Sequence, residues 1–177
     1  PNPLDARESV LRTSLRPGLL RALAYNASHR NEGVGLFEMG KVFLPPAPGD
    51  ERPPEPEQLG VARAGREAPD AVAVWLVVAE ALGLDAELRA EPVAGLHPTR
   101  SAVIVGGDAV LGAVGEIDPA VAEAWGVSER VAWLELDLDA VGAAPRRART
   151  HRPVSRFPSN DIDLAFVVDD EVPAALV

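Results

Sequence analysis

A helix that begins at a proline and leads into an apolar strand constrains the fold of this sequence more than any other feature. Pro17 suits a first helical turn, because it lacks only an N–H group that this turn leaves unpaired. Apolar residues then recur on one helical face, at Leu19, Leu20, Leu23, Ala24 and Ala27. Asn31 to Gly33 interrupt the period, and residues 34–43 are typical of a strand bounded by turn residues. The pair predicts a mixed α/β or α+β core.

Two further stretches predict antiparallel hairpins. Residues 45–57 hold six prolines in thirteen positions, so they favour an exposed loop that lacks backbone donors. Since residues 59–64 resume a strand pattern, this loop would connect a hairpin. Residues 101–105 and 109–117 form a second pair around a glycine turn. Asp118 and Pro119 then suit the start of a short helix that ends near Gly126.

Residues 68–82 give the clearest helix. Pro69 and Asp70 suit its first turn, and Gly83 suits its end. Its apolar residues cover nearly every face, which predicts burial almost all round. Such a helix would lie between a sheet and a second surface, for which a subunit interface is one candidate.

The C-terminal third predicts a strand, a basic linker and the start of another domain. Residues 131–138 alternate between apolar and acidic residues, as in a half-buried strand. Residues 145–157 carry five arginines and no acid, without helical or strand period. Residues 161–168 are typical of a strand, and a helix would begin near Pro173. We therefore expect a main domain over residues 1–144, a linker over 145–159 and an incomplete domain over 160–177.

Several of these segments together resemble one protein family, the β subunit of bacterial phenylalanyl-tRNA synthetase. The resemblance runs through nearly the whole chain, in order: Asn2-Pro3-Leu4, Leu11-Arg12-Thr13-Ser14-Leu15, Pro17-Gly18-Leu19, residues 36–43, Leu96-His97-Pro98 with Ser101-Ala102, residues 112–119, Arg156-Phe157-Pro158 and residues 161–165. It implies an α+β fold, with an antiparallel sheet flanked by helices as in a class II aminoacyl-tRNA synthetase. Residues 160–177 would begin the family's ferredoxin-like anticodon-binding domain.

The resemblance also implies that this module is a catalytically inactive copy. In class II synthetases the strand that resembles residues 36–43 ends in Phe-Arg, and that arginine holds the ATP α-phosphate. Here Phe43 is followed by Leu44-Pro45-Pro46, and the glycine-rich third motif with its arginine is absent. No catalytic, cofactor-binding or metal-binding residue is therefore expected in this chain. The whole enzyme would join phenylalanine to its tRNA with Mg-ATP, at an active site on the partner α subunit.

The implied partners are the α subunit, in a heterotetramer, and tRNA. Candidate interface residues lie on the first helix and its approach: Arg12, Leu15, Leu19, Leu23 and Tyr25. The same stripe could instead face the chain's own sheet. Candidate RNA contacts are Arg146, Arg147 and Arg149, for which a solvated linker is the alternative.

Composition narrows the remaining possibilities. A net charge of −10 argues against nucleic-acid binding over the whole surface, so any RNA contact would be local. The absence of cysteine excludes disulfides and thiolate chemistry. The longest apolar run, residues 71–79, is far shorter than the roughly 20 residues that span a bilayer. No signal peptide is recognised, so we expect a cytoplasmic protein without membrane contact.

Two alternative functions stay open at this point. One is a small metal-dependent enzyme that uses Asp137 with Asp139, or Asp161 with Asp163, because residues two apart share one face of a strand. Solvent-facing strand residues explain these pairs more simply. The other is an RNA-binding module that acts through the basic linker. His29, His97 and His151 lack the spacing of metal ligands, and His97 is expected in a loop.

Overall fold

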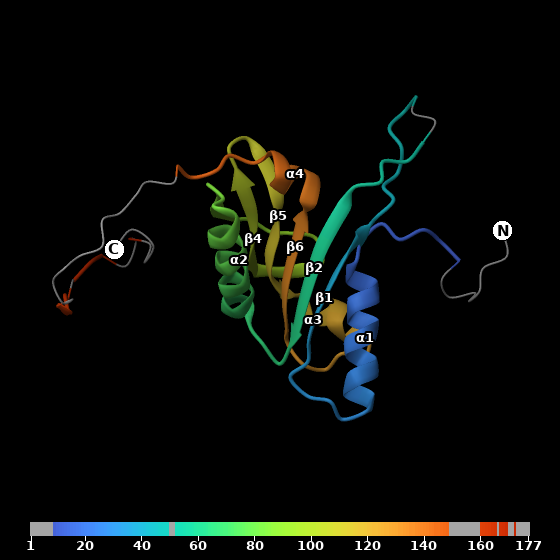
Figure 1. The fold of residues 1–177 in the computed structure, drawn as a ribbon. Helices are drawn as coiled ribbons and strands as arrows, with labels where there is room; N and C mark the ends of the chain where they lie inside the picture. Colours follow the sequence, from blue (N-terminus) through green and yellow to red (C-terminus); the bar gives the residue numbers. More distant parts are fainter. Residues whose placement is uncertain (1–8, 50–51, 149–159, 166, 170–171, 173–177) are drawn as a thin grey trace. The chain divides into compact units, whose positions relative to one another are not determined.

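The computed structural model describes residues 9–49, 52–148, 160–165, 167–169 and 172. Its centre is a six-stranded antiparallel sheet with the order β1-β2-β6-β5-β4-β3 (Figure 1). The strands are β1 (Gly35–Lys41), β2 (Glu57–Ala64), β3 (Glu87–Ala90), β4 (Leu96–Gly106), β5 (Ala109–Ile117) and β6 (Val131–Asp137). The chain divides into two units, residues 1–147 and 148–177, and the sheet belongs to the first.

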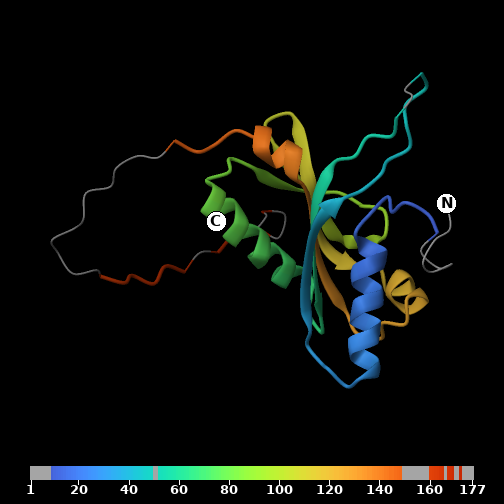
Figure 2. The same cartoon turned by 45° about the vertical axis from the view of Figure 1, so that its right-hand side comes forward.

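Helices cover both faces of the sheet. The helices α1 (Arg16–Ser28) and α3 (Pro119–Ala124) share one core with the sheet, and α2 (Ala68–Leu82) and α4 (Leu138–Ala143) share a second core on the other side (Figure 2). The predicted class, an α+β fold built on an antiparallel sheet, is therefore confirmed.

The strand β6 lies between these two cores. Val131 and Trp133 belong to the core under α1, whereas Ala132, Leu134 and Leu136 belong to the core under α2. The prediction of a half-buried strand was wrong for this reason. Glu135 and Asp137 mark an alternation in the sequence, but a central strand with helices on both sides buries residues of both parities.

The first helix packs closely against β2. Leu15, Leu19, Leu20 and Leu23 are buried in the core that α1 shares with the sheet. Gly60 permits this approach, since a Cβ atom there would lie 3.0 Å from Leu19 Cδ1 and 3.3 Å from Leu15 Cβ. The predicted strand after the helix is β1, and it pairs with β2 as the predicted hairpin.

The second helix has the predicted bounds but not the predicted burial. Glu67 and Asp70 form a reciprocal capping box, and Gly83 ends the helix in the left-handed region at a φ of 62°. Only Ala71, Trp75 and Ala79 are fully buried, whereas Leu76 and Val77 are 57% and 70% exposed. Burial almost all round was therefore wrong, because α2 has the sheet on one side and no described element on the other.

The predicted hairpin of residues 101–117 is present as β4 and β5, and Asp118 caps α3 by accepting a hydrogen bond from the Ala120 N–H at 2.8 Å. The sequence analysis missed β3 and α4. It also extended β6 to Leu138, which instead begins α4.

Residues 161–168 were predicted to form a strand, and the described residues of this range carry none. Within the described residues 161–165 and 167–168 no backbone ladder is present. A strand needs a neighbour to satisfy its backbone groups, and the described residues of the second unit provide none. Residues 149–159 and the predicted helix near Pro173 lie outside the described residues.

Candidate functional surfaces

The structure separates the five candidate interface residues into two groups. Leu15, Leu19 and Leu23 are at most 4% exposed and face the chain's own sheet, which is the alternative left open above. Arg12 and Tyr25 are exposed. The apolar stripe of α1 is thus part of the internal core, and its opposite side remains available to a partner.

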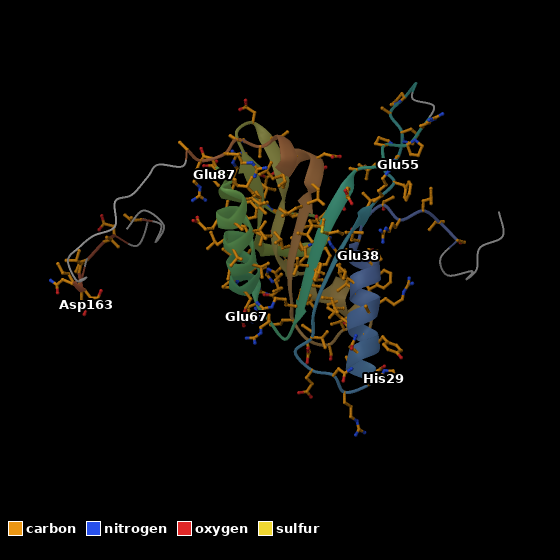
Figure 3. The ribbon with its side chains drawn as sticks, in the orientation of Figure 1. His29, Glu38, Glu55, Glu67, Glu87 and Asp163 are labelled. Carbon is orange, nitrogen blue, oxygen red and sulfur yellow. The ribbon has the colours of Figure 1, made fainter. Side chains whose placement is uncertain are left out.

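Arg12 fastens the segment before α1 to the first strand. Its guanidinium is paired with Glu38, its Nε donates to the Lys41 carbonyl at 2.9 Å, and its own carbonyl accepts from the Phe43 N–H at 2.8 Å. Figure 3 shows Glu38 beside α1 and His29 at the far end of that helix. These contacts give Arg12 a structural role in the chain itself.

A second surface is apolar and was not predicted. Phe37 and Met39 are 73% and 58% exposed on β1, and they lie opposite Val61 and Leu59 of β2 in the ladder. Val61 and Leu59 pack against the core on the α2 side. Side chains opposite each other in an antiparallel pair share a face, so these four residues form one strip. We call it the β1–β2 apolar face.

The two described arginines of the basic segment hold the end of the first unit in place. Arg146 donates to the carbonyls of Leu82 (3.2 Å) and Val141 (2.9 Å), and Arg147 Nε donates to the Leu84 carbonyl at 2.7 Å. The Arg147 N–H also donates to the Gly83 carbonyl at 2.8 Å. Cations at these carbonyls satisfy acceptors at the C-terminal end of α2. Arg149 lies outside the described residues.

The aspartates that were considered as metal-binding pairs on one face of a strand are not arranged in that way. Asp137 caps α4 by accepting from the Ala140 N–H at 2.9 Å, and Asp139 lies inside that helix, so the two are not on one face of a strand. Asp161 and Asp163 are exposed in a segment without a strand. Among the described residues no group of three or more potential ligands could hold a metal ion.

The histidines are engaged locally. His29 Nδ1 contacts the Tyr25 carbonyl at 2.9 Å. His97 was expected in a loop but lies in β4, where its Nδ1 accepts from the Thr99 N–H at 3.3 Å. His151 lies outside the described residues.

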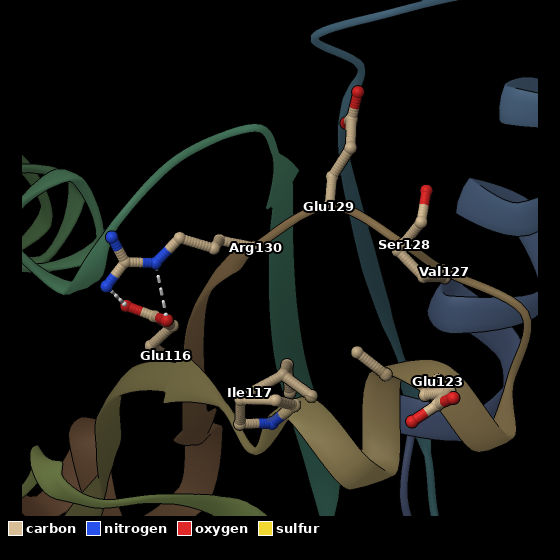
Figure 4. A pocket seen from close by; sticks show the side chains of 9 residues that line it. Glu116, Ile117, Glu123, Val127, Ser128, Glu129 and Arg130 are labelled. Atoms are coloured by element: carbon tan, nitrogen blue, oxygen red, sulfur yellow. Dashed lines mark hydrogen bonds and ion pairs between the residues drawn. The ribbon is translucent and has the colours of Figure 1, made fainter.

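The sequence analysis missed an ionic cluster around Glu116. This carboxylate is 1% exposed and accepts from Arg130 Nε at 2.8 Å (Figure 4). It also accepts from Arg100 at 3.1 Å, and Arg130 also pairs with Glu67. Burial raises the pKa of Glu116, but the hydrogen bonds and charges of Arg130 and Arg100 outweigh it and lower that pKa below the ordinary value of 4.5. The carboxylates of Glu116 and Glu67 raise the pKa of Arg130, chiefly through the hydrogen bond to Glu116.

A cavity of about 350 Å³ lies beside this cluster, lined by Glu116, Ile117, Pro119, Ala122, Glu123, Val127, Ser128, Glu129 and Arg130 (Figure 4). The most buried polar group that lines the cavity is the Glu116 carboxylate, which two arginines already hydrogen-bond. This indicates a structural ion pair rather than a reactive acid. A glutamate inside the apolar strand of residues 109–117 was the signal that could have revealed it.

A second ionic cluster lies on the α1 side of the sheet. Arg16 donates to Glu135 at 2.9 Å and to the Ala94 carbonyl at 2.8 Å, and its guanidinium lies 5.3 Å from the centre of the Trp133 ring. Trp133 Nε1 donates to the same Glu135 at 2.9 Å. These contacts join α1 to β6 through the shared carboxylate of Glu135.

Comparison with known proteins identifies related chains. A model of the family described as "Phenylalanyl tRNA synthetase beta chain CLM domain" matches residues 1–138. The chain is 34% identical to the phenylalanine–tRNA ligase beta subunit of Geobacter sulfurreducens over 98% of its own length, and 38% identical to that of Anaeromyxobacter dehalogenans over 99%. It spans about a quarter of these relatives, 24% of each.

A solved structure supports the fold. The pyrrolysyl-tRNA synthetase of Desulfitobacterium hafniense superposes with a TM-score of 0.58 at 19% identity, covering 72% of this chain and 47% of that one. At this identity the similarity concerns architecture. None of the helices in the described part of the chain is long and apolar enough to cross a membrane.

Proposed function

Since this chain belongs to the family of phenylalanyl-tRNA synthetase beta chains, we propose that it is a structural, non-catalytic module of the β subunit of phenylalanine–tRNA ligase. It would support the α subunit and tRNA while the whole enzyme attaches phenylalanine to its tRNA with Mg-ATP in the cytoplasm. Residues 1–144 would form the module, residues 145–159 a linker, and residues 160–177 the start of the next domain.

The β1–β2 apolar face is the observation that carries this proposal. Phe37 and Met39 stand side by side on an edge strand, and no described helix covers them. Exposed apolar strips on a sheet edge favour association with another protein surface. We therefore assign the α-subunit contact to this face, on the α2 side of the sheet, rather than to the buried leucines of α1. The exposed Arg12 and Tyr25 belong to the α1 side of the sheet.

The sequence after β1 supports a role without chemistry. Phe43 is followed by Leu44, Pro45 and Pro46, so no cation stands where class II synthetases place an arginine for the ATP phosphate. The two prolines also lack N–H groups that could hold a phosphate in its place.

A titration against the α subunit of the same source tests the proposal, with complex formation followed by size exclusion and light scattering. The unmodified chain should form a stable complex. A Phe37→Ser/Met39→Ser double variant should weaken it at least tenfold, because two apolar side chains at the contact are lost.

Val110→Ser provides the matched control, since Val110 is similarly exposed, at 59%, but lies on β5, which β6 separates from β2 in the sheet order. Equal binding by the double variant and the control would exclude the β1–β2 apolar face as the contact. Failure of the unmodified, folded chain to bind the α subunit would reject the supporting role for this module on its own.

A further inference from the structure

The outer edge of β1 presents backbone groups that no described residue pairs. β1 stands first in the sheet order, so only β2 lies beside it. Directly after the strand, the Val42 N–H donates to the Pro56 carbonyl on the β2 side at 3.0 Å. Backbone groups alternate in direction along a strand, so the even-numbered residues of β1 bond to β2 and the odd-numbered residues face outward. Phe37 and Met39 therefore point their N–H and C=O groups away from the sheet, where no described residue bonds to them.

Arg12 closes one end of this edge and leaves the rest open. Phe43, an odd-numbered residue, donates its N–H to the Arg12 carbonyl at 2.8 Å, and the Lys41 carbonyl accepts from Arg12 Nε at 2.9 Å. Both contacts lie on the outward side of the strand. Figure 2 shows β1 at the border of the sheet, between the layers of α1 and α2. We call residues 35–39 the β1 open edge.

The β1 open edge lacks the usual protection of an edge strand. Native edge strands are commonly kept apart by prolines, by bulges or by charged side chains. Residues 35–41 hold no proline, and their ladder with β2 runs without a register shift. The central charge, Glu38, is already ion-paired with Arg12. An apolar edge of this kind favours pairing with another strand.

We propose that the β1 open edge binds the same edge of a second copy of this chain, so that the two sheets continue as one antiparallel sheet across a two-fold axis. With the axis at Glu38, Phe37 of each copy lies opposite Met39 of the other. Both residues face outward, so each such pair exchanges two N–H···O=C bonds. The next outward pair sets Lys41 opposite Gly35, which has no side chain to obstruct it.

The side chains favour a second copy on both faces of the joined sheet. On the α2 side, Phe37 and Met39 of the two copies would form one continuous apolar strip, with sulfur against aromatic rings. On the α1 side, the two Glu38 carboxylates would face each other and repel if they were unpaired. Each is ion-paired with Arg12 of its own chain, so two acids meet two cations and the charges balance.

Sedimentation equilibrium of the full 177-residue chain tests the proposal. The α subunit is absent from this experiment, so its outcome is separate from that of the proposed function. The unmodified chain should form a reversible dimer. Phe37→Ser/Met39→Ser should weaken dimerisation by about tenfold or more, because each dimer loses four apolar side chains at the contact, whereas Val110→Ser should not. Met39→Pro should also weaken it, since proline removes an outward N–H that β2 does not use.

Amide hydrogen exchange of the unmodified chain, followed by NMR, tests the strand pairing without any variant. In the monomer the amides of Phe37 and Met39 should exchange fast, and those of Glu38 and Gly40, which bond to β2, should exchange slowly. In the dimer the first two should become protected by about tenfold or more.

Three results would overturn the proposal. One is a dimer in which the amides of Phe37 and Met39 exchange as fast as in the monomer. Another is a dimer that Phe37→Ser/Met39→Ser and Val110→Ser weaken equally. The third is a folded chain that stays monomeric at every concentration; if that chain still binds the α subunit, the proposed function stands and only the pairing of two copies is rejected.

Discussion

At the scale of the single residue, Glu116 is the one charged side chain that is fully buried among the described residues. Its two arginine partners are Arg100 in β4, sixteen positions earlier in the sequence, and Arg130 directly before β6, fourteen positions later. A charge in this position is tolerated because it is paired and hydrogen-bonded.

Glu116→Gln should reduce the free energy of unfolding by about 1 to 3 kcal/mol near neutral pH, because charge-assisted bonds to Arg100 and Arg130 are lost. Urea denaturation measures this change. Glu123→Gln, an exposed residue at the same cavity, should change stability by less than about 0.5 kcal/mol.

The effect of Glu116 should also depend on pH. Folding lowers the pKa of Glu116 below 4.5, so its contribution is complete above that pH and is lost as the pH falls through the lower folded-state pKa. The stability difference between the unmodified chain and Glu116→Gln should therefore stay constant from pH 7 to about 5 and shrink in stronger acid. A difference that grows on acidification would contradict the pKa direction.

The close packing of α1 against Gly60 leads to a second prediction at the residue scale. Gly60→Val should destabilise the fold by about 1 to 3 kcal/mol, because the new side chain meets Leu19, Leu15 and Trp133 within 3.4 Å and pushes α1 off the sheet. Gly142→Ala in α4 is the control, since its Cβ meets nothing within 4 Å, and it should be neutral or stabilising. Thermal unfolding of both variants measures their stability and tests this prediction.

At the scale of the element, α2 shows what sequence could and could not predict. Pro69, Asp70 and Gly83 are local signals, and they predicted both ends of the helix. Its burial depends on what lies against each side, which no local signal carries. The same limit explains why the burial of β6 was predicted wrongly, because its burial depends on neighbours, β2 and β5, that are separated from it in the sequence.

Short elements were harder to predict than long ones. β3 has four exposed residues with no apolar alternation, so only its pairing with β4 makes it a strand. The helix α4 was not predicted because Leu138 continues the apolar pattern of β6. Only the Asp137 side chain, which caps the helix, marks the end of the strand and the start of α4. Of the candidate site, sequence found the arginines and Tyr25 on and before α1 but not the β1–β2 apolar face, which requires the cross-strand register.

The exposed side of α2 leads to an element-scale prediction. Leu76→Lys should leave the free energy of unfolding within about 0.5 kcal/mol, because this side chain is exposed, whereas Trp75→Ala, one residue earlier, should cost about 3 to 5 kcal/mol. Urea denaturation compares them. Similar losses for both variants would mean that α2 is covered on both sides after all.

At the scale of the whole molecule, the first unit ends at Arg147, and its last two arginines donate to carbonyls of Leu82 and Leu84 at the end of α2. A chain shortened after Arg147 should melt within about 2 °C of the full chain. A chain shortened after Ala144 should melt several degrees lower, at roughly 3 °C for each kcal/mol of lost hydrogen bonding. Calorimetry that finds equal melting of both shortened chains would show that these arginines contribute nothing.

The strand order has a consequence for how the protein is made. β6 is the last strand of the sheet to be synthesised, yet it lies between β2 and β5 and separates the two hairpins of the chain. A nascent chain can pair β1 with β2 and β4 with β5 early, since these contacts are local. The two halves have no common neighbour until residues 131–137 leave the ribosome, so both cores close in a single late event. Until then the apolar edges of β2 and β5 stand open, and this is the interval in which a growing chain would most need a chaperone.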